Sequence, residues 1–159
     1  MTTPTDIERI SAGGPTGSLQ LGKHREVIQS VGATRTLTAA ESGALCLFDV
    51  ATGNAYTLPT PVEGMQFEFL ATVDVTSNAY AVNTAAATQF LLGAVNSTKL
   101  AAGTDIFQAN GTAHVGISMA GSTTGGLIGS TFTLTAISAT QWVIAGSLVG
   151  SGTLADPFI

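Results

Sequence analysis

The chain has 159 residues, of which 45% are hydrophobic and only 9% are charged, and its formal net charge is −5. An ordinary soluble domain has about 25% charged residues, so Thr, Ser, Asn, Gln, Gly and Ala must form much of this surface. No run approaches the roughly 20 apolar residues of a membrane-spanning helix, which argues against a membrane partner. Charged residues are depleted from interface cores, so the composition favours a body that neighbouring subunits partly cover.

The charge is distributed unevenly along the chain. Residues 1–35 sum to +1, whereas residues 36–159 sum to −6. A nucleic-acid-binding domain needs a basic face that neutralises phosphates, so we expect no nucleic-acid partner for the acidic body. The mildly basic leader can still contact an acidic partner surface through its four cations, Arg9, Lys23, Arg25 and Arg35.

The first 22 residues have no helical or strand periodicity and contain two Pro and four Gly among Thr and Ser. This composition predicts an extended arm that becomes ordered when it binds a partner, and the alternative is an unattached tail. Lys23–Val31 is the one charged patch, and it can form a first strand or a helical turn, of which we prefer the strand. We therefore divide the chain into an arm at 1–35 and a body at 36–159. No basic segment leads into an apolar run near the start, so no secretory signal is expected.

The clearest strand of the body is Met65–Val73. Its apolar side chains alternate with polar ones, which is typical of a half-buried strand. Two earlier strands, Ala44–Asp49 and Ala55–Leu58, flank a Gly-Asn turn. A further strand at Ala79–Asn83 follows, with Tyr80 and Val82 on one face.

The second half shows three more strand regions. Strands at Gln89–Val95 and Asp105–Gln108 are predicted around a surface loop, Asn96–Thr104. Asn110-Gly111 predicts a hairpin turn into a strand at Ala113–Met119. The next segment, Ala120–Gly129, is a Gly-rich loop, which has neither the spacing of a phosphate loop nor any Lys or Arg.

A hairpin and a short tail close the chain. The alternation in Thr131–Ile137 and Gln141–Leu148 predicts two strands, and Trp142 is expected to be a core or inter-subunit anchor. Phe158 and Ile159 would be costly to leave in water, so the tail is expected to dock against the body or a neighbour. Trp142, Phe158 and Ile159 are therefore the candidate subunit-interface residues. About ten short strands without a convincing helix indicate an all-β fold, a β-sandwich or jelly-roll-like single domain.

No arrangement of residues points to catalysis, so we expect no enzyme, no metal site and no cofactor. His24 and His114 have no partner His, Cys or carboxylate at ligand spacing, and no GxSxG motif is present. Cys46 stands alone in an apolar run and predicts a small buried hydrophobe. Paired carboxylates for sugar cleavage would have to come from Asp49, Glu63, Glu68, Asp74 or Asp105, and a solvated face is the simpler interpretation of these acids.

One extended pattern is similar to a known family. It comprises TLTAAESG at Thr36–Gly43, an apolar strand ending in Phe48-Asp49, then Thr57-Leu58-Pro59 and the spaced run from Pro61 through Gly64 and Phe67 to Phe69. This resembles the capsid decoration (cement) proteins of tailed bacteriophages, in which such a run opens a small β-domain and a Trp-bearing hairpin closes it. The resemblance covers Thr36 to Gly146. The chain departs from the family in its long leader and in Ala44-Leu45-Cys46, where the family often has a Lys.

The resemblance implies a virion protein on the capsid surface, made in the bacterial host cytoplasm. Such a protein would be a homotrimer that clamps neighbouring copies of the major capsid protein, and here Arg9, Lys23, Arg25 and Arg35 would be the capsid contacts. One alternative is a tail-fibre or receptor-binding module that holds a glycan with the loops Asn96–Thr104 and Ala120–Gly129. Another is a small polysaccharide-degrading domain with carboxylates shared between subunits.

Overall fold

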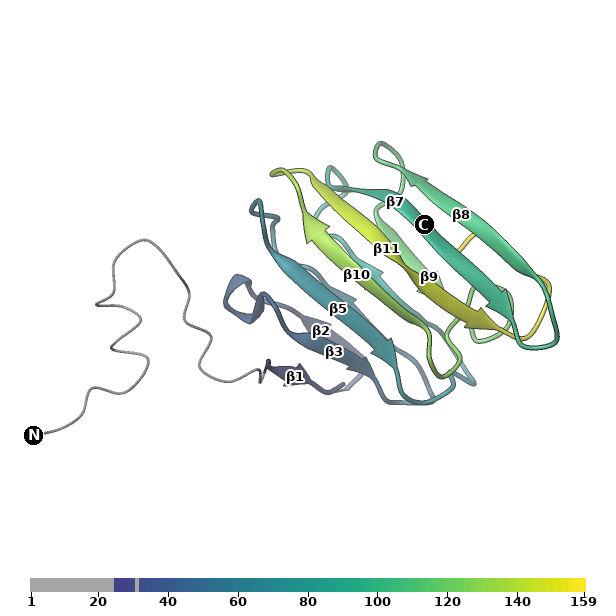
Figure 1. Ribbon diagram of the computed structural model, residues 1–159. Helices are drawn as coiled ribbons and strands as arrows, with labels where there is room; N and C mark the ends of the chain where they lie inside the picture. The colour runs from purple at the N-terminus through teal and green to yellow at the C-terminus, as the bar shows by residue number, and fades with distance from the viewer. Residues whose placement is uncertain (1–24, 31) are drawn as a thin grey trace, which may run out of the picture.

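The computed structural model describes residues 25–30 and 32–159, which form a two-sheet β-sandwich (Figure 1). The larger sheet has seven strands in the order β1-β3-β5-β10-β11-β7-β8, and the smaller has four in the order β2-β4-β6-β9. The elements are β1 (Val27–Ile28), β2 (Thr34–Thr36), a 3-10 helix η1 (Ala39–Glu41), β3 (Leu45–Phe48), β4 (Asn54–Thr57), β5 (Gln66–Ala71), β6 (Tyr80–Asn83), β7 (Phe90–Lys99), β8 (Thr104–Asn110), β9 (Gly116–Met119), β10 (Thr131–Ala136) and β11 (Gln141–Gly150). The predicted all-β sandwich is confirmed.

The first six strands alternate between the two sheets. β1, β3 and β5 lie side by side in the larger sheet and β2, β4 and β6 in the smaller one, and every pair is parallel. Leu45, for example, lies opposite Val27 on one side and Glu68 on the other. The turn after Phe48 therefore carries the chain from one sheet to the other, because parallel neighbours cannot be joined by a tight hairpin.

The second half adds antiparallel pairs. The predicted closing hairpin is confirmed, with β10 and β11 antiparallel and Leu134 opposite Ile144. β10 also pairs with β5, β6 with β9, and β7 with β8, while β7 runs parallel to β11. Five of the nine pairings are thus parallel. Jelly rolls are antiparallel, so the sandwich is the predicted alternative that the structure matches.

The core lies between the two sheets and follows the alternation of each strand. In β5 the buried side chains are Phe67, Phe69 and Ala71, as predicted, and in β6 they are Tyr80 and Val82. Aromatic rings connect the layers: Phe48 of the larger sheet stacks on Tyr80 of the smaller one with ring centroids 4.6 Å apart. Each large apolar side chain contributes about 1.5–3 kcal/mol when it is buried, so both rings of this contact between the sheets add to the stability.

Two connections differ from their prediction. Asn96–Thr104 is not a loop, because β7 continues to Lys99 and β8 begins at Thr104, which leaves only residues 100–103 as the connection. The turn at Asn110-Gly111 exists, with Gly111 at φ 79°. It does not make a hairpin, since β9 lies in the other sheet.

The boundary of the predicted arm also changes. Val27–Ile28 is a strand, as preferred, and it pairs with β3, while Thr34–Thr36 pairs with β4. Residues 27–28 and 34–36 therefore belong to the sandwich, because their backbone groups complete the two sheets, and a boundary at residue 35 is wrong. Residues 1–24 of the predicted arm lie outside the described residues.

Candidate binding surfaces

The outward side of the seven-stranded sheet is a broad surface with few charges. We call it the outer face and define it by the outward side chains of its strands. Register aligns them in rows, one of which runs Leu45, Glu68, Thr133, Ala145, Ala94, Gln108. The complete set is Val27, Leu45, Leu47, Gln66, Glu68, Leu70, Phe90, Leu92, Ala94, Asn96, Thr98, Thr104, Ile106, Gln108, Asn110, Thr131, Thr133, Thr135, Gln141, Val143, Ala145, Ser147 and Val149. Among these positions Glu68 carries the only charge, although the chain as a whole is acidic.

Arg25 lies against this outer face and neutralises that one charge. Its guanidinium donates to Glu68 over 2.6 Å, and the two side chains are 44% and 37% exposed. An exposed pair of this kind contributes about 0–1 kcal/mol. The ion pair therefore holds Arg25 only weakly, and its role as a contact residue stays a prediction.

Arg35 lies in a different environment. It is opposite Tyr56 in the smaller sheet, and its guanidinium donates to Glu41 of η1 over 2.5 Å, with side chains 29% and 16% exposed. Burial raises the pKa of Glu41, but hydrogen bonds from the Thr38 backbone and from Arg35 outweigh it, so that the pKa is lowered overall. The hydrogen bond to Glu41 likewise raises the pKa of Arg35. The structure thus places Arg35 in an internal ion pair, while Arg9 and Lys23 lie outside the described residues.

Trp142 lies in the core of its own chain. Its side chain is fully buried and packs against Phe67 with ring centroids 6.1 Å apart. The subunit-interface prediction for Trp142 is therefore corrected: alternation along β11 turns Trp142 and Ile144 inward, toward the smaller sheet. The indole Nε1–H has no hydrogen-bond partner within the described part of the chain.

The C-terminal tail docks on its own body. Phe158 is buried and forms an antiparallel bridge with Ile117 of β9, and its ring lies 5.5 Å from that of His114. The Ile159 carbonyl accepts hydrogen bonds from the backbone N–H groups of Val115 and Gly116. Of the predicted interface residues, only Ile159 keeps an exposed side chain, at 52%.

Three of the candidate catalytic groups make hydrogen bonds to the backbone of their own chain. Asp49 accepts a hydrogen bond from the Ser30 backbone and Asp74 one from the Ile128 backbone, so both serve structural connections. The Nδ1 of His114 accepts from the Asn110 backbone. Residues 25–30 and 32–159 contain no group of three His, Cys, Asp or Glu side chains that could hold a metal ion. Burial raises the pKa of Cys46 to about 12, which keeps the thiol protonated.

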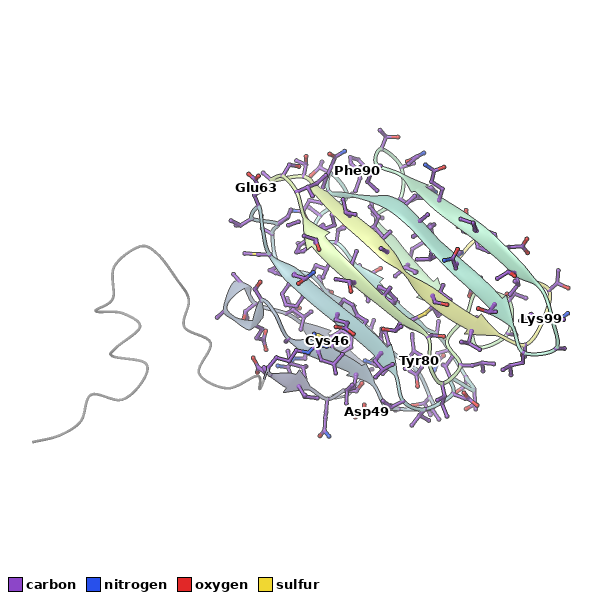
Figure 2. All side chains as sticks on the ribbon, in the orientation of Figure 1. Cys46, Asp49, Glu63, Tyr80, Phe90 and Lys99 are labelled. Atoms are coloured by element: carbon purple, nitrogen blue, oxygen red, sulfur yellow. The ribbon has the colours of Figure 1, made fainter. Side chains whose placement is uncertain are left out.

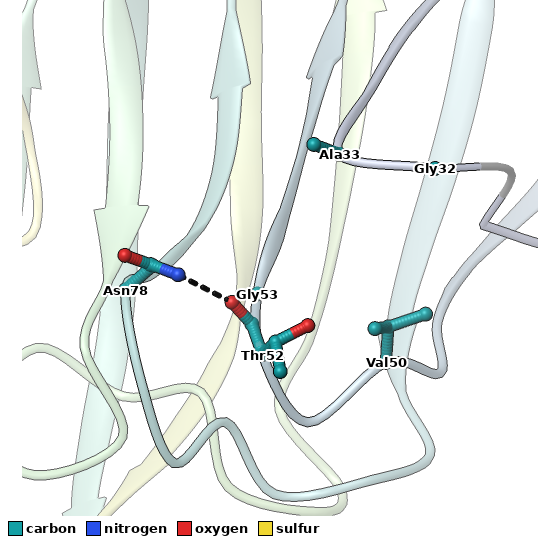
Figure 3. Close-up of a pocket in the computed structure, with 6 residues that line it drawn as sticks. All are labelled: Gly32, Ala33, Val50, Thr52, Gly53 and Asn78. Carbon is teal, nitrogen blue, oxygen red and sulfur yellow. Dashed lines mark hydrogen bonds between the residues drawn. The ribbon is translucent and has the colours of Figure 1, made fainter.

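One small cleft opens at the end of the sandwich near β2 and β4. It has a volume of about 370 Å³ and is lined by Gly32, Ala33, Val50, Thr52, Gly53 and Asn78 (Figure 3). Ligand pockets usually offer several polar groups. Here the Asn78 amide nitrogen already donates to the Thr52 carbonyl over 2.8 Å, and none of the six described residues that line the cleft is charged. The cleft offers little with which to hold a polar ligand.

The loop Ala120–Gly129 is folded onto itself and onto the body. The backbone N–H of Gly121 donates to the Gly125 carbonyl over 2.6 Å, and Ala120 donates to Thr124 Oγ1 over 2.9 Å. Ile128 is anchored to Asp74. The other segment of the glycan-binding alternative, Asn96–Thr104, consists mostly of strand, and only residues 100–103 form the connection. Figure 2 shows the side chains on the ribbon, with Glu63 and Lys99 at opposite ends of the sandwich.

Comparisons with protein-family models, curated proteins and solved structures give no match. Within the described residues, no helix is long and apolar enough to cross a membrane. The described residues form an all-β sandwich, and its neutral outer face is the main candidate for binding.

Proposed function

We propose that this protein is a structural component of a tailed-phage virion that binds the outside of the assembled capsid and stabilises it. In this role it acts as a homotrimer and clamps neighbouring copies of the major capsid protein. The observation that supports the proposal is the neutral outer face: seven aligned strands present Thr, Ala, Gln and aliphatic side chains with one charged position, Glu68. Such a composition suits burial against another protein, because few charged side chains would have to be desolvated.

The stabilisation would follow from mass action. A protein that binds the assembled shell, and does not bind its separated subunits, shifts the equilibrium toward the shell by RT ln(1 + [L]/Kd). Three linked copies add avidity, so each contact can be weak. The basic leader would supply the charged contacts through Arg9, Lys23 and Arg25, whereas the Arg35 guanidinium is held by Glu41.

The first experiment compares the full chain with a variant that lacks residues 1–24. This deletion ends before β1 and so leaves both sheets complete. Each protein is mixed with empty capsids of the phage that encodes it, and binding is measured by co-sedimentation. We expect the full chain to bind and to raise the melting temperature of the shell, and the truncated chain to bind at least tenfold more weakly while its circular dichroism stays unchanged.

The two parts of the proposal fail separately. A full chain that does not bind these capsids would overturn the capsid role. Equal binding by the truncated chain would overturn only the role of the leader.

To test the outer face, Thr133→Glu at its centre is compared with Thr57→Glu on the outward side of the smaller sheet. We expect capsid binding to weaken more for Thr133→Glu, because it places a charge on the surface that we expect to be buried.

A further inference from the structure

Strand β8 is a long edge strand in which Asp105 is the only charged residue. It spans Thr104–Asn110, pairs with β7 alone among the described strands, and lies at the margin of the seven-stranded sheet (Figure 1). Edge strands are usually kept from pairing by shortness, Lys, Pro or bulges. β8 has seven residues without Lys or Pro, and Ile106 is 72% exposed. The strand at the other edge, β1, has two residues.

The pairing with β7 shows which backbone groups of β8 are free. The Gly111 N–H donates to the Leu91 carbonyl, and the Lys99 N–H to the Gly103 carbonyl. Hydrogen-bonded positions alternate along an antiparallel ladder, so the odd-numbered residues of β8 face β7. The N–H and C=O groups of Thr104, Ile106 and Gln108 therefore point away from the sheet, and no partner for them is found in the described part of the chain.

We propose that β8 pairs antiparallel with β8 of a second copy, about a two-fold axis at Ile106. In this register Thr104 lies opposite Gln108 of the second copy, and Ile106 lies opposite its own equivalent. The three residue pairs can exchange six backbone hydrogen bonds. The two exposed Ile106 side chains cover each other on the outer face, and Asp105 lies opposite Phe107 of the second copy, so the two carboxylates do not face each other.

A neighbouring register is less favourable. Centring the axis on Phe107 would pair Thr104 with Asn110 of the second copy. The Asn110 N–H of each copy already donates to His114 Nδ1 over 3.3 Å, so this register loses two of its eight hydrogen bonds and keeps six, no more than the axis at Ile106. It also places Ile106 opposite Gln108 of the second copy, so the two exposed Ile106 side chains no longer lie opposite each other. The axis at Ile106 uses only groups that are free.

A second copy fits this edge better than any other described strand. Among the described strands, the other sheet edges are β1 and β2, with two and three residues, and β9, which the tail residue Phe158 covers. Only another β8 offers an edge of equal length. The pairing goes beyond the proposed function, because it can form without a capsid. In the proposed trimer other surfaces hold the three subunits together, and the β8 pairing would then join one trimer to another.

The experiment cross-links the full chain through single introduced thiols. A two-fold axis at Ile106 places the two Ile106 Cα atoms about 5.5 Å apart, within the range of a disulfide. The two Gln108 residues would be four positions apart along the ladder, roughly 14 Å. Under mild oxidation, Ile106→Cys should give a covalent dimer on a non-reducing gel and Gln108→Cys should give at least tenfold less. The native Cys46 is fully buried and is present in both variants, so it does not account for a difference in cross-linking between them.

A second measurement does not depend on cross-linking. Ile106→Lys should halve the mass of the species in light scattering, because the two lysine side chains would lie opposite each other at the axis and repel. Ile128→Lys, at a similarly exposed apolar residue in a loop, should leave the mass unchanged. Equal cross-linking at 106 and 108, or a mass that Ile106→Lys leaves unchanged, would overturn the pairing. Neither readout involves capsids, so failure of capsid binding would not affect it.

Discussion

Arg35 and Glu41 form a partly buried ion pair that joins the edge strand β2 to the helix η1, with a distance of 2.5 Å between Nη2 and Oε1. The second carboxylate oxygen of Glu41 accepts from both the backbone N–H and the hydroxyl of Thr38. A single carboxylate therefore holds the strand, the helix and the residue between them. A second ion pair among the described residues, Arg25 with Glu68, has one hydrogen bond, and its side chains are more exposed.

Glu41→Gln should lower the free energy of unfolding by about 1.5–3 kcal/mol, the usual contribution of hydrogen bonds to a charged group. The matched change Glu68→Gln should cost less than about 1 kcal/mol, because its ion pair is exposed. Urea unfolding followed by circular dichroism measures both. Equal costs for the two variants would show that Glu41 does not organise this corner of the sandwich.

The same carboxylate predicts a dependence on pH. The pKa of Glu41 in the folded protein is lowered from its ordinary 4.5. A group with a lowered folded pKa stabilises the protein fully above its unfolded pKa and loses that contribution as the pH falls through the folded value. The stability difference between the wild type and Glu41→Gln should therefore be constant from pH 7 to about pH 5 and shrink below pH 4.5. Urea midpoints measured at intervals of half a pH unit test this, and a difference that grows on acidification would contradict it.

Gly93 should be intolerant of substitution because of its place inside the sheet. Its φ is 127°, and a Cβ atom would lie 2.2 Å from the backbone carbonyl oxygen of Ile144. Gly103 has a similar φ of 122° but open space around it. Gly103→Ala should therefore cost only backbone strain, about 1–3 kcal/mol. Gly93→Ala adds a clash with the neighbouring strand and should prevent stable folding at 37 °C. Thermal melts of the two variants separate strain from clash, and similar melting temperatures would refute the clash.

Local patterns predicted the individual strands well. The alternation in Met65–Val73 and in Thr131–Leu148 identified the buried sides of β5, β10 and β11, because one buried face imposes a period of two. The turn at Gly53-Asn54 was also visible. The path of the chain after this turn could not be predicted. A turn of the same composition can close a hairpin or carry the chain to the opposite sheet, and only long-range packing decides which.

The binding surface was harder to predict. The outer face comes from the register of seven strands that lie far apart in the sequence, such as β7 beside β11. Short-range patterns contain no information on that register. The same limit explains why the environment of Trp142 could not be predicted. The alternation along its strand showed which residues lie on the same side as Trp142. It could not show whether that side packs against the chain's own core or against a neighbouring subunit.

Trp142→Ala should therefore behave as a core substitution. Removing a buried aromatic side chain costs about 3–5 kcal/mol, and this loss should be the same at low and at high protein concentration. Trp142→Phe should cost less, because it keeps most of the ring volume and removes an indole N–H that has no partner among the described residues. Urea unfolding at two protein concentrations tenfold apart tests this. A side chain at a subunit contact would instead stabilise the protein more at the higher concentration, and such a concentration dependence for Trp142→Ala would return Trp142 to the interface.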